Sequence, residues 1–504
     1  MSNDPFADLA RNQRLRGRWS RLRHTMLRPL RPDRIRPRRE GPPNLLLMGI
    51  DTLRADHVGC YGSPTPTTPC LDRLAGGGTV FCDVTAPAPW TLPSFASALT
   101  GRMPGLHGAY LGADVRNMDQ QPPRRLAPDV VTLAGHLRRC GYRTAAFYSN
   151  QFFAFGLAET FDHHAYHNLA AADLAAVARD WIRRHADRPF FCFVLFNDPH
   201  EPTTPRLEDL QPFLSAARAR GSAATDEQIA RLARWGEPPL PHLGKDRDDP
   251  GLQAALDLKL AIYAATVHEV DRAVGGLQDQ LAAWDLAERT LVSVFSDHGE
   301  EFREHAAEAR RWAHDPRGLA GVGHGHTQFQ ELLHVPWVSW GPGVPVARRE
   351  KRPASLCDLA PTLAHWLGVD PLPLDGTAPD AAAIGTGLPL YGKSQAEPAD
   401  AGAEPRLILA EALAYGPDLV ALRRDNLKLV AHRDGRPLGL YDLQADPGEK
   451  VDLQQDHPDE LAALLAALAR WRDSGLGATG DQGGDWQDLD NTVRQRLRDL
   501  GYSD

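Results

Sequence analysis

The sequence predicts an α/β protein with a smaller antiparallel sheet in its C-terminal part. Two observations support this fold class. Between residues 44 and 367, short apolar runs alternate with longer segments that carry apolar residues at helical spacing, which is typical of strands connected by helices. From residue 406 the pattern changes to short, closely spaced strands that precede an amphipathic segment at residues 459–473.

The individual elements follow from the same patterns. Apolar runs rich in Val, Phe and Leu predict strands, at residues 44–50, 80–83, 144–149, 190–196, 290–295 and 335–340. Amphipathic spacing predicts helices, at residues 72–78, 95–99, 130–140, 170–185, 252–284 and 354–367. The C-terminal strands are expected at residues 407–411, 419–424, 427–430 and 440–443.

The length of 504 residues fits one large α/β domain with appendages, or two domains. We divide the chain into a basic N-terminal arm, a main α/β domain, a loop and a C-terminal α+β subdomain, at residues 1–40, 41–370, 371–405 and 406–504. Residues 203–250 are rich in Pro, Arg, Asp and Ala. We interpret them as an insertion or lid that shapes access to a substrate site.

The charge is distributed unevenly along the chain. The net charge is −9, yet residues 1–40 hold 12 Arg, no Lys and 4 acidic residues. The acidic remainder argues against general nucleic-acid binding. In the arm, apolar residues around Trp19 recur at helical spacing with Arg between them. Two interpretations stay open: a helix that lies on an anionic membrane surface, or a solvated basic extension.

Cysteine usage and hydropathy give an expectation for the compartment. The six Cys are scattered, without a CxxC pair or zinc-finger spacing, and Cys192 lies within an apolar run. We therefore expect reduced cysteines in a cytoplasmic protein, located peripherally at the membrane if the arm binds there. The sequence contains no signal-peptide core and no apolar run of transmembrane length.

Polar side chains directly follow four of the predicted strands. They are Asp51 with Thr52, Asn150, Asp198 with His200, and Asp297 with His298. Side chains at the carboxyl ends of strands in an open α/β sheet face the ligand crevice. The sequence therefore predicts one composite site built from distant segments.

A threonine in the segment at residues 88–102 is the candidate nucleophile. Pro89 and Pro93 flank Thr91 and restrict the backbone around it, so we expect a tight turn followed by a helix over residues 95–99. The free N–H groups of a helix start attract an anion, and a hydroxyl beside them suits phosphoryl or sulfuryl transfer. The alternative interpretation is a helix N-cap.

The residue types at the strand ends suit a divalent cation. Asp51, Asp297, His298 and the Thr91 oxygen form a mixed oxygen and nitrogen set, which favours Zn²⁺ or Mn²⁺ over Ca²⁺ or Mg²⁺. Such a cation would lower the pKa of the Thr91 hydroxyl. His200 and His324 are candidates to hold a substrate oxygen, to protonate the leaving group, or to bind a second metal with Asp198.

The order of these segments resembles the sulfatase family of the alkaline phosphatase superfamily. The resemblance rests on PNLLLMGID (43–51), GCYG (59–62), TTPCLD (67–72), TLPSFASALTGR (91–102), DPHEP (198–202), SDHGE (296–300) and VP (335–336). SLCDLAPTL (355–363), NLKL (426–429) and YDLQADPGE (441–449) extend it into the tail. Together the segments span about residues 43–455 in family order.

The resemblance implies a sandwich with a large mixed central sheet, flanking helices and a C-terminal subdomain. It also implies a divalent metal at the positions of Asp51, Asp297 and His298, with Thr52 where many sulfatases have a second aspartate. Thr91 matches the nucleophile, His200 a histidine that faces the substrate, and His324 a residue that contacts the substrate.

The nucleophile motif departs from the family pattern. Typical sulfatases have Cys or Ser at the Thr91 position, which is converted to formylglycine, and Arg at the Phe95 position. Threonine cannot form that aldehyde, because its Cβ carries a methyl group. We therefore expect hydrolysis of a phosphate ester, favouring a diester, through a covalent Thr91 intermediate. The alternatives are a sulfate ester hydrolase with an unmodified nucleophile, a phospho-group transferase, or an inactive scaffold that binds membranes.

Overall fold

The computed structural model describes residues 40–112, 115–118, 122–201, 205–219, 221–222, 252–313, 315–319, 321–373 and 406–475. The predicted basic arm and the loop at residues 371–405 therefore lie almost entirely outside the described residues. Much of the insertion at residues 203–250 and the last 29 residues of the chain also lie outside them.

The centre of the molecule is an eight-stranded mixed sheet in the order β12-β2-β11-β8-β1-β7-β5-β6. The strands from β8 to β6 run parallel; they are β8 (Thr290–Ser296), β1 (Asn44–Ile50), β7 (Phe190–Phe196), β5 (Arg143–Tyr148) and β6 (His163–Tyr166). Strand β11 (Trp337–Trp340) runs antiparallel to β8 and to β2 (Thr79–Phe81), and β12 (Arg348–Glu350) pairs parallel with β2. The predicted α/β class with a large mixed sheet is confirmed.

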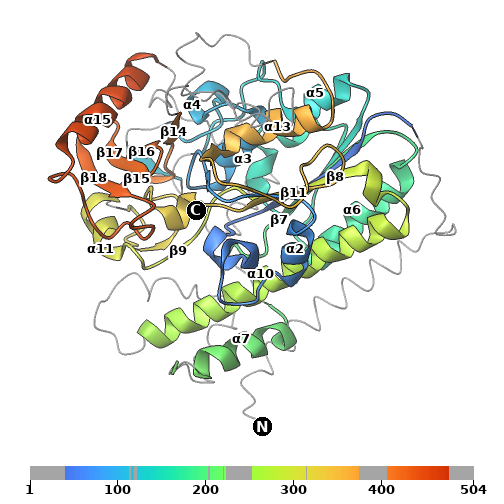
Figure 1. Ribbon diagram of the computed structural model, residues 1–504, viewed down its shortest axis with the longest axis horizontal. Helices are drawn as coiled ribbons and strands as arrows, with labels where there is room; N and C mark the ends of the chain where they lie inside the picture. Colours follow the sequence, from blue (N-terminus) through green and yellow to red (C-terminus); the bar gives the residue numbers. More distant parts are fainter. Residues whose placement is uncertain are drawn as a thin grey trace.

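Helices cover both faces of this sheet (Figure 1). Strand β1 is buried throughout, and its side chains alternate between two hydrophobic clusters, with Leu45 and Leu47 in one and Leu46 and Met48 in the other. The first cluster includes α3 (Thr91–Thr100), α5 (Leu133–Arg139) and α13 (Leu359–Trp366), and the second includes α2 (Pro69–Ala75), α6 (Ala171–His185) and α10 (Leu252–Ala283). The sheet is therefore the middle layer of a sandwich.

The C-terminal part forms a separate four-stranded antiparallel sheet, as predicted. Its order is β14-β16-β17-β18, with β14 (Leu407–Ala410), β16 (Leu419–Arg424), β17 (Leu427–His432) and β18 (Pro437–Asp442). Helix α15 (Pro458–Asp473) covers one face through Leu464, Leu468 and Trp471. This sheet lies beside the main domain on the side of α11 (Ala306–Glu308) and β9 (Glu301–Phe302) (Figure 1).

Several elements differ from the sequence prediction. The insertion contains α7 (Leu207–Ala219), which packs against α10 through Leu210 and Phe213. Strand β6 was not predicted, because its side chains are half exposed and contribute little apolar signal. The remaining short elements are β3 (Val84–Thr85), α4 (Pro104–His107), β4 (Val115–Asn117), β10 (Val322–Gly323), α12 (Gln330–Leu333), β13 (Ala354–Ser355) and β15 (Tyr415–Pro417).

None of the described helices, including the 32-residue α10, carries an apolar stretch long enough to cross a bilayer.

Candidate active site

Neighbouring parallel strands deliver the predicted residues to one edge of the sheet. Asp51 directly follows β1, Asp297 directly follows β8, and Asn150 lies two residues beyond β5. Strand β7, between β1 and β5, leads to His200. Because these strands are adjacent and parallel, their carboxyl ends meet, and the expected composite arrangement is present.

Thr91 lies at the start of α3 rather than in a turn before it. The helix begins at Thr91 instead of residue 95, with Trp90 in an extended conformation as its N-cap. Proline is tolerated here because N–H groups in the first turn of a helix have no intrahelical partner, so Pro93 continues the helix. Ser94 Oγ donates to the backbone oxygen of Asp297 at 2.6 Å and fixes the helix start against the loop after β8.

Three side chains surround the Nε2 atom of His298. Thr91 Oγ1, Asp51 Oδ1 and Asp297 Oδ2 each lie 3.4 Å from it. The amide of Asn150 donates to Asp51 Oδ2 at 2.6 Å and lies 3.4 Å from Thr91 Oγ1. All five residues are buried, so the group is shielded from water.

Burial makes two adjacent carboxylates unfavourable without a compensating positive charge. It raises the pKa of Asp51 to about 6, and burial together with the Asp51 charge raises the pKa of Asp297 well above its ordinary value. The pKa of His298 is held well below its usual range by burial and by His324. The imidazole is therefore neutral and does not balance the two acids.

The unpaired carboxylate oxygens of this group are suited to bind a divalent cation. Asp51 Oδ1 and Asp297 Oδ2 have no hydrogen-bond partner, although buried polar atoms are normally paired. One carboxylate oxygen from each aspartate and one His298 nitrogen lie within 4.8 Å of one another. Ligands placed about 2.0–2.2 Å from a tetrahedral ion are separated by roughly 3.3–3.6 Å, and the observed 3.4 Å spacings from His298 Nε2 match that range.

The tautomer of His298 follows from its second nitrogen. Nδ1 lies 2.8 Å from the backbone oxygen of Gly299, and a carbonyl oxygen only accepts hydrogen bonds. The proton of the neutral ring is therefore on Nδ1, and the lone pair of Nε2 points toward Thr91, Asp51 and Asp297. This is the form that binds a cation or accepts a proton.

Thr52 adopts an unusual backbone conformation beside these ligands. Its φ is 57°, in the left-handed region, which is unfavourable for a β-branched residue. Its N–H donates to Asp297 Oδ1 at 3.3 Å, and its carbonyl accepts from the Tyr263 hydroxyl at 2.6 Å. Thr52 therefore orients Asp297 through its backbone. The Thr52 hydroxyl oxygen is buried and has no hydrogen-bond partner in the part of the chain that the structure describes.

His324 and His200 extend the site away from Thr91. The ring centroid of His324 lies 4.5 Å from that of His298 and 4.9 Å from that of His200. Glu300 Oε2 accepts from His324 Nδ1 at 3.0 Å. The Nε2 atom of the neutral His324 ring therefore carries a lone pair and no proton. Burial lowers the pKa of His324 well below its usual value. Glu300 was not among the predicted site residues, although it lies within the SDHGE segment at residues 296–300.

Asp198 contacts the start of helix α6. Ala170, at the N-cap of α6, has no side chain that can accept a hydrogen bond, and Asp198 Oδ1 accepts from the Ala171 N–H at 3.0 Å instead. Among the described residues, the group able to hold a metal contains Asp51, Asp297 and His298, without Asp198. A second metal held by Asp198 and His200 stays a prediction.

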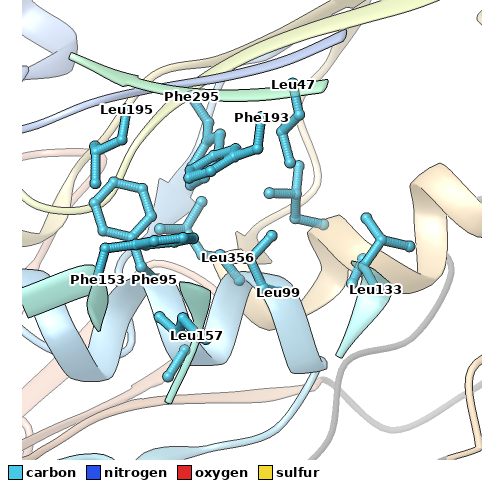
Figure 2. Packing of buried hydrophobic residues seen from close by; sticks show 14 of the residues in the cluster. Leu47, Phe95, Leu99, Leu133, Phe153, Leu157, Phe193, Leu195, Phe295 and Leu356 are labelled. Carbon is cyan, nitrogen blue, oxygen red and sulfur yellow. The ribbon is translucent and has the colours of Figure 1, made fainter. Parts of the chain in front are cut away.

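Phe95 lies one turn after Thr91 on α3 and is part of the hydrophobic core. Its ring centroid lies 5.6 Å from that of Phe295 and 6.0 Å from that of Phe193, and Figure 2 shows these side chains packed together. Gly49 in β1 makes room for the ring, because an added Cβ there would lie 2.6 Å from Phe95 Cε1. No charged group can occupy position 95 without disrupting this packing.

Comparison with known proteins places this geometry in a family context. The model of the family described as Sulfatase matches residues 43–369. Human arylsulfatase A (Homo sapiens) is 28% identical over 477 residues, which cover 85% of this chain and 86% of that protein.

Two solved structures share the fold. A protein solved as BT4656 in complex with its substrate D-glucosamine-2-N,6-O-disulfate superposes with a TM-score of 0.65 at 17% identity, over 86% of this chain and 98% of that one. The phosphonate monoester hydrolase of Agrobacterium radiobacter superposes with a TM-score of 0.61 at 20% identity, over 86% and 96%. The fold thus occurs with both sulfur and phosphorus substrates in those proteins.

Proposed function

The chain belongs to the sulfatase family, and from this premise we propose that it is a metal-dependent ester hydrolase in which Thr91 is the nucleophile. The observation that carries the proposal is the position of Thr91 Oγ1, 3.4 Å from both His298 Nε2 and Asn150 Nδ2 at the start of α3. That position combines a hydroxyl, a cation-binding group and the free N–H groups of a helix start.

Asp51, Asp297 and His298 would hold the cation. When bound, it would lower the pKa of the Thr91 hydroxyl and neutralise negative charge on the transferred group. Asn150 contributes independently, because its amide can donate one N–H to Asp51 and the other toward Thr91 Oγ1. Donation to that oxygen favours its deprotonated form and orients it for attack.

The chemical steps then involve this chain's own groups. Thr91 Oγ1 gives up its proton and attacks the central phosphorus or sulfur atom, the bond to the leaving oxygen breaks, and that oxygen takes up one proton, which His200 or His324 would accept and pass on. Water then attacks the same central atom and breaks its bond to Oγ1; one water proton returns to Oγ1, and the hydroxyl stays on the central atom. Glu300 accepts from His324 Nδ1, so His324 Nε2 is the atom that would first accept the proton released by Thr91 and then pass it to the leaving oxygen.

We favour a phosphate ester, and a diester in particular. The Cβ of Thr91 carries no second hydroxyl through which a covalent ester could be expelled, so the intermediate must be cleaved by direct attack of water on its central atom. Cleavage of a phosphothreonine by this route matches the second step above. A sulfate ester is the second candidate, because arylsulfatase A matches most of this chain.

Kinetics of Thr91 variants test the proposal. With Zn²⁺ or Mn²⁺ added, we expect turnover of bis(p-nitrophenyl) phosphate, or of p-nitrophenyl sulfate for the second candidate. Thr91→Ala should lower kcat by at least about 10³-fold, and Thr91→Ser should retain part of it. Acid quenching should trap a modified peptide that contains Thr91.

Thr100→Ala is the matched control. Thr100 is a buried threonine on the same helix, and its hydroxyl donates to the backbone oxygen of Ala96 at 2.7 Å, away from the ligands. Its variant should keep wild-type turnover. Wild-type turnover by Thr91→Ala would exclude Thr91 as the nucleophile.

A further inference from the structure

An ion pair at the far end of the histidine group is not explained by the catalytic steps. Lys259, on α10, is only 4% exposed, and its Nζ lies 2.8 Å from Glu201 Oε1. Glu201 directly follows His200, and its side chain is 26% exposed. The pair therefore joins a buried ammonium to a carboxylate that is open to solvent on one side.

The pair is connected to Thr91 by a continuous line of side chains. His298 contacts Thr91, the His324 ring lies beside His298, and the His200 ring lies beside His324. The Nδ1 atom of His200 is hydrogen-bonded to the backbone oxygen of Glu201. Glu201 thus lies next in line after the two histidines that would pass a proton to the leaving oxygen.

Contacts of helix α10 with the loop after β1 fix the position of Lys259. Tyr263 lies one turn beyond Lys259 on the same helix and donates its hydroxyl to the backbone oxygen of Thr52. The Phe302 ring lies 5.0 Å from the Tyr263 ring and 5.4 Å from Lys259 Nζ. Residues one helical turn apart share a face, so the face of α10 that contacts the loop after β1 also presents Lys259.

Among the described residues, Glu201 and Lys259 form fewer side-chain hydrogen bonds than their groups allow. An ammonium has three N–H donors, and the bond to Glu201 is the one that Lys259 makes among the described residues. A second pair on α10 differs, because Arg272 and Asp209 form two parallel bonds of 2.6 Å that engage both carboxylate oxygens. The Arg272–Asp209 pair engages both carboxylate oxygens, whereas among the described residues the Glu201–Lys259 bond engages one carboxylate oxygen and one ammonium N–H.

We propose that Glu201 and Lys259 form a leaving-group subsite that binds a hydroxyl group next to the scissile ester oxygen. A hydroxyl can donate to the carboxylate and accept from the ammonium at once. A further anionic group fits less well, because Glu201 already neutralises Lys259. The substrate class is therefore an ester of a neutral polyhydroxy alcohol. This inference rests on the proposed function of the same site.

The test compares esters that differ only in the hydroxyl groups of the leaving alcohol. Methyl glyceryl phosphate and methyl propyl phosphate form one pair, and glyceryl and propyl sulfate form the other. If the metal-loaded wild type hydrolyses bis(p-nitrophenyl) phosphate, the phosphate pair is used. If it hydrolyses p-nitrophenyl sulfate, the sulfate pair is used. We expect a kcat/KM preference for the glyceryl ester of about 10- to 100-fold, since a site built around a hydroxyl discriminates strongly against its absence.

Variants identify the origin of the preference. Lys259→Met should reduce it to within about threefold while p-nitrophenyl ester turnover changes little, because p-nitrophenol has no neighbouring hydroxyl. Glu201→Gln, which still accepts from Lys259, is a second variant with a milder perturbation and should also weaken the preference. Arg272→Met is the matched control on the same helix and should keep it.

Two results would overturn the subsite. One is a wild type without preference for the glyceryl ester. The other is a Lys259→Met variant in which turnover of the p-nitrophenyl, glyceryl and propyl esters falls by the same factor, so that the preference for the glyceryl ester is kept. That result would mean that the pair only positions His200. Calorimetric titration of Thr91→Ala protein with the same esters measures the preference without turnover. An inactive wild type therefore counts against the proposed function alone, whereas equal affinities count against the subsite.

Discussion

Replacement of Asp51 by asparagine tests whether the two buried carboxylates depend on a cation. Burial raises the pKa of Asp51 from 3.8 to about 6 in the cation-free protein. A shift of about two units corresponds to about 3 kcal/mol between the protonated and charged forms. Asparagine is neutral and its side-chain oxygen can still accept from Asn150, so Asp51→Asn removes the unfavourable charge and keeps the hydrogen bond.

The pH dependence has a definite sign. Because the folded pKa lies above the unfolded value, the protonated carboxyl favours folding below about pH 4, and this contribution is lost as the pH rises through about 6. In chelator, we expect the free energy of unfolding of Asp51→Asn to rise relative to wild type by roughly 2–3 kcal/mol between about pH 4 and about pH 7. Urea unfolding followed by tryptophan fluorescence measures this difference.

Addition of a cation should reverse the order of stability. Zn²⁺ or Mn²⁺ at about 100 times its dissociation constant stabilises the folded wild type by about 2.7 kcal/mol, whereas Asp51→Asn should gain much less. Asp187→Asn, which alters an exposed carboxylate paired with Arg143, is the control and should respond to the cation like wild type. A chelated Asp51→Asn protein that is less stable than wild type near pH 7, or equal stabilisation of both by the cation, would refute the reasoning.

Two further substitutions probe the proposed role of Thr91 and the packing of its helix α3. Asn150→Ala should lower kcat by roughly 100-fold with a small change in KM, because it removes a donor aimed at Thr91 Oγ1; unchanged kcat in steady-state assays would contradict this role. Phe95→Arg should lower the free energy of unfolding by about 3–5 kcal/mol, because it buries an unpaired charge among aromatic rings. Urea unfolding checks the second expectation, which a stability equal to wild type would contradict.

The positions of the strand-end residues could be predicted because they depend on local sequence and one topological rule. The apolar runs before Asp51, Asn150 and Asp297 identify buried strands, and parallel strands bring their carboxyl ends together. Strands β8, β1, β7 and β5 are neighbours in the sheet, so the residues that follow them lie close together. What the local pattern could not determine is which side chain at each strand end turns toward the shared edge.

Asp198 illustrates that limit. It follows β7 as Asp51 follows β1, yet it accepts from the first N–H of α6 because Ala170 cannot cap that helix. The role of Asp198 depends on a residue 28 positions earlier in the chain, and a strand-by-strand analysis does not include that contact.

Glu300, Ser94 and Lys259 were missed for a related reason. Each acts through a partner distant in sequence: His324 for Glu300, the Asp297 backbone for Ser94, and Glu201 for Lys259. Their residue types are common on surfaces and in helices, so spacing alone gives no signal. Their burial and partners emerge only when the loops after β7 and β8 pack against α3 and α10.

The charge balance of the assembled site also limits its substrate. Burial keeps His298 and His324 neutral, Lys259 is neutralised by Glu201, and Phe95 contributes no charge beside the nucleophile. The two carboxylates that would hold a divalent cation offset most of its charge, so the positive charge left for the transferred group would be small. A singly charged ester, such as a phosphate diester or a sulfate monoester, requires less compensation in this environment than a dianionic phosphate monoester. The absence of a cationic side chain at position 95 thus favours the same substrate charge as the chemistry proposed for Thr91.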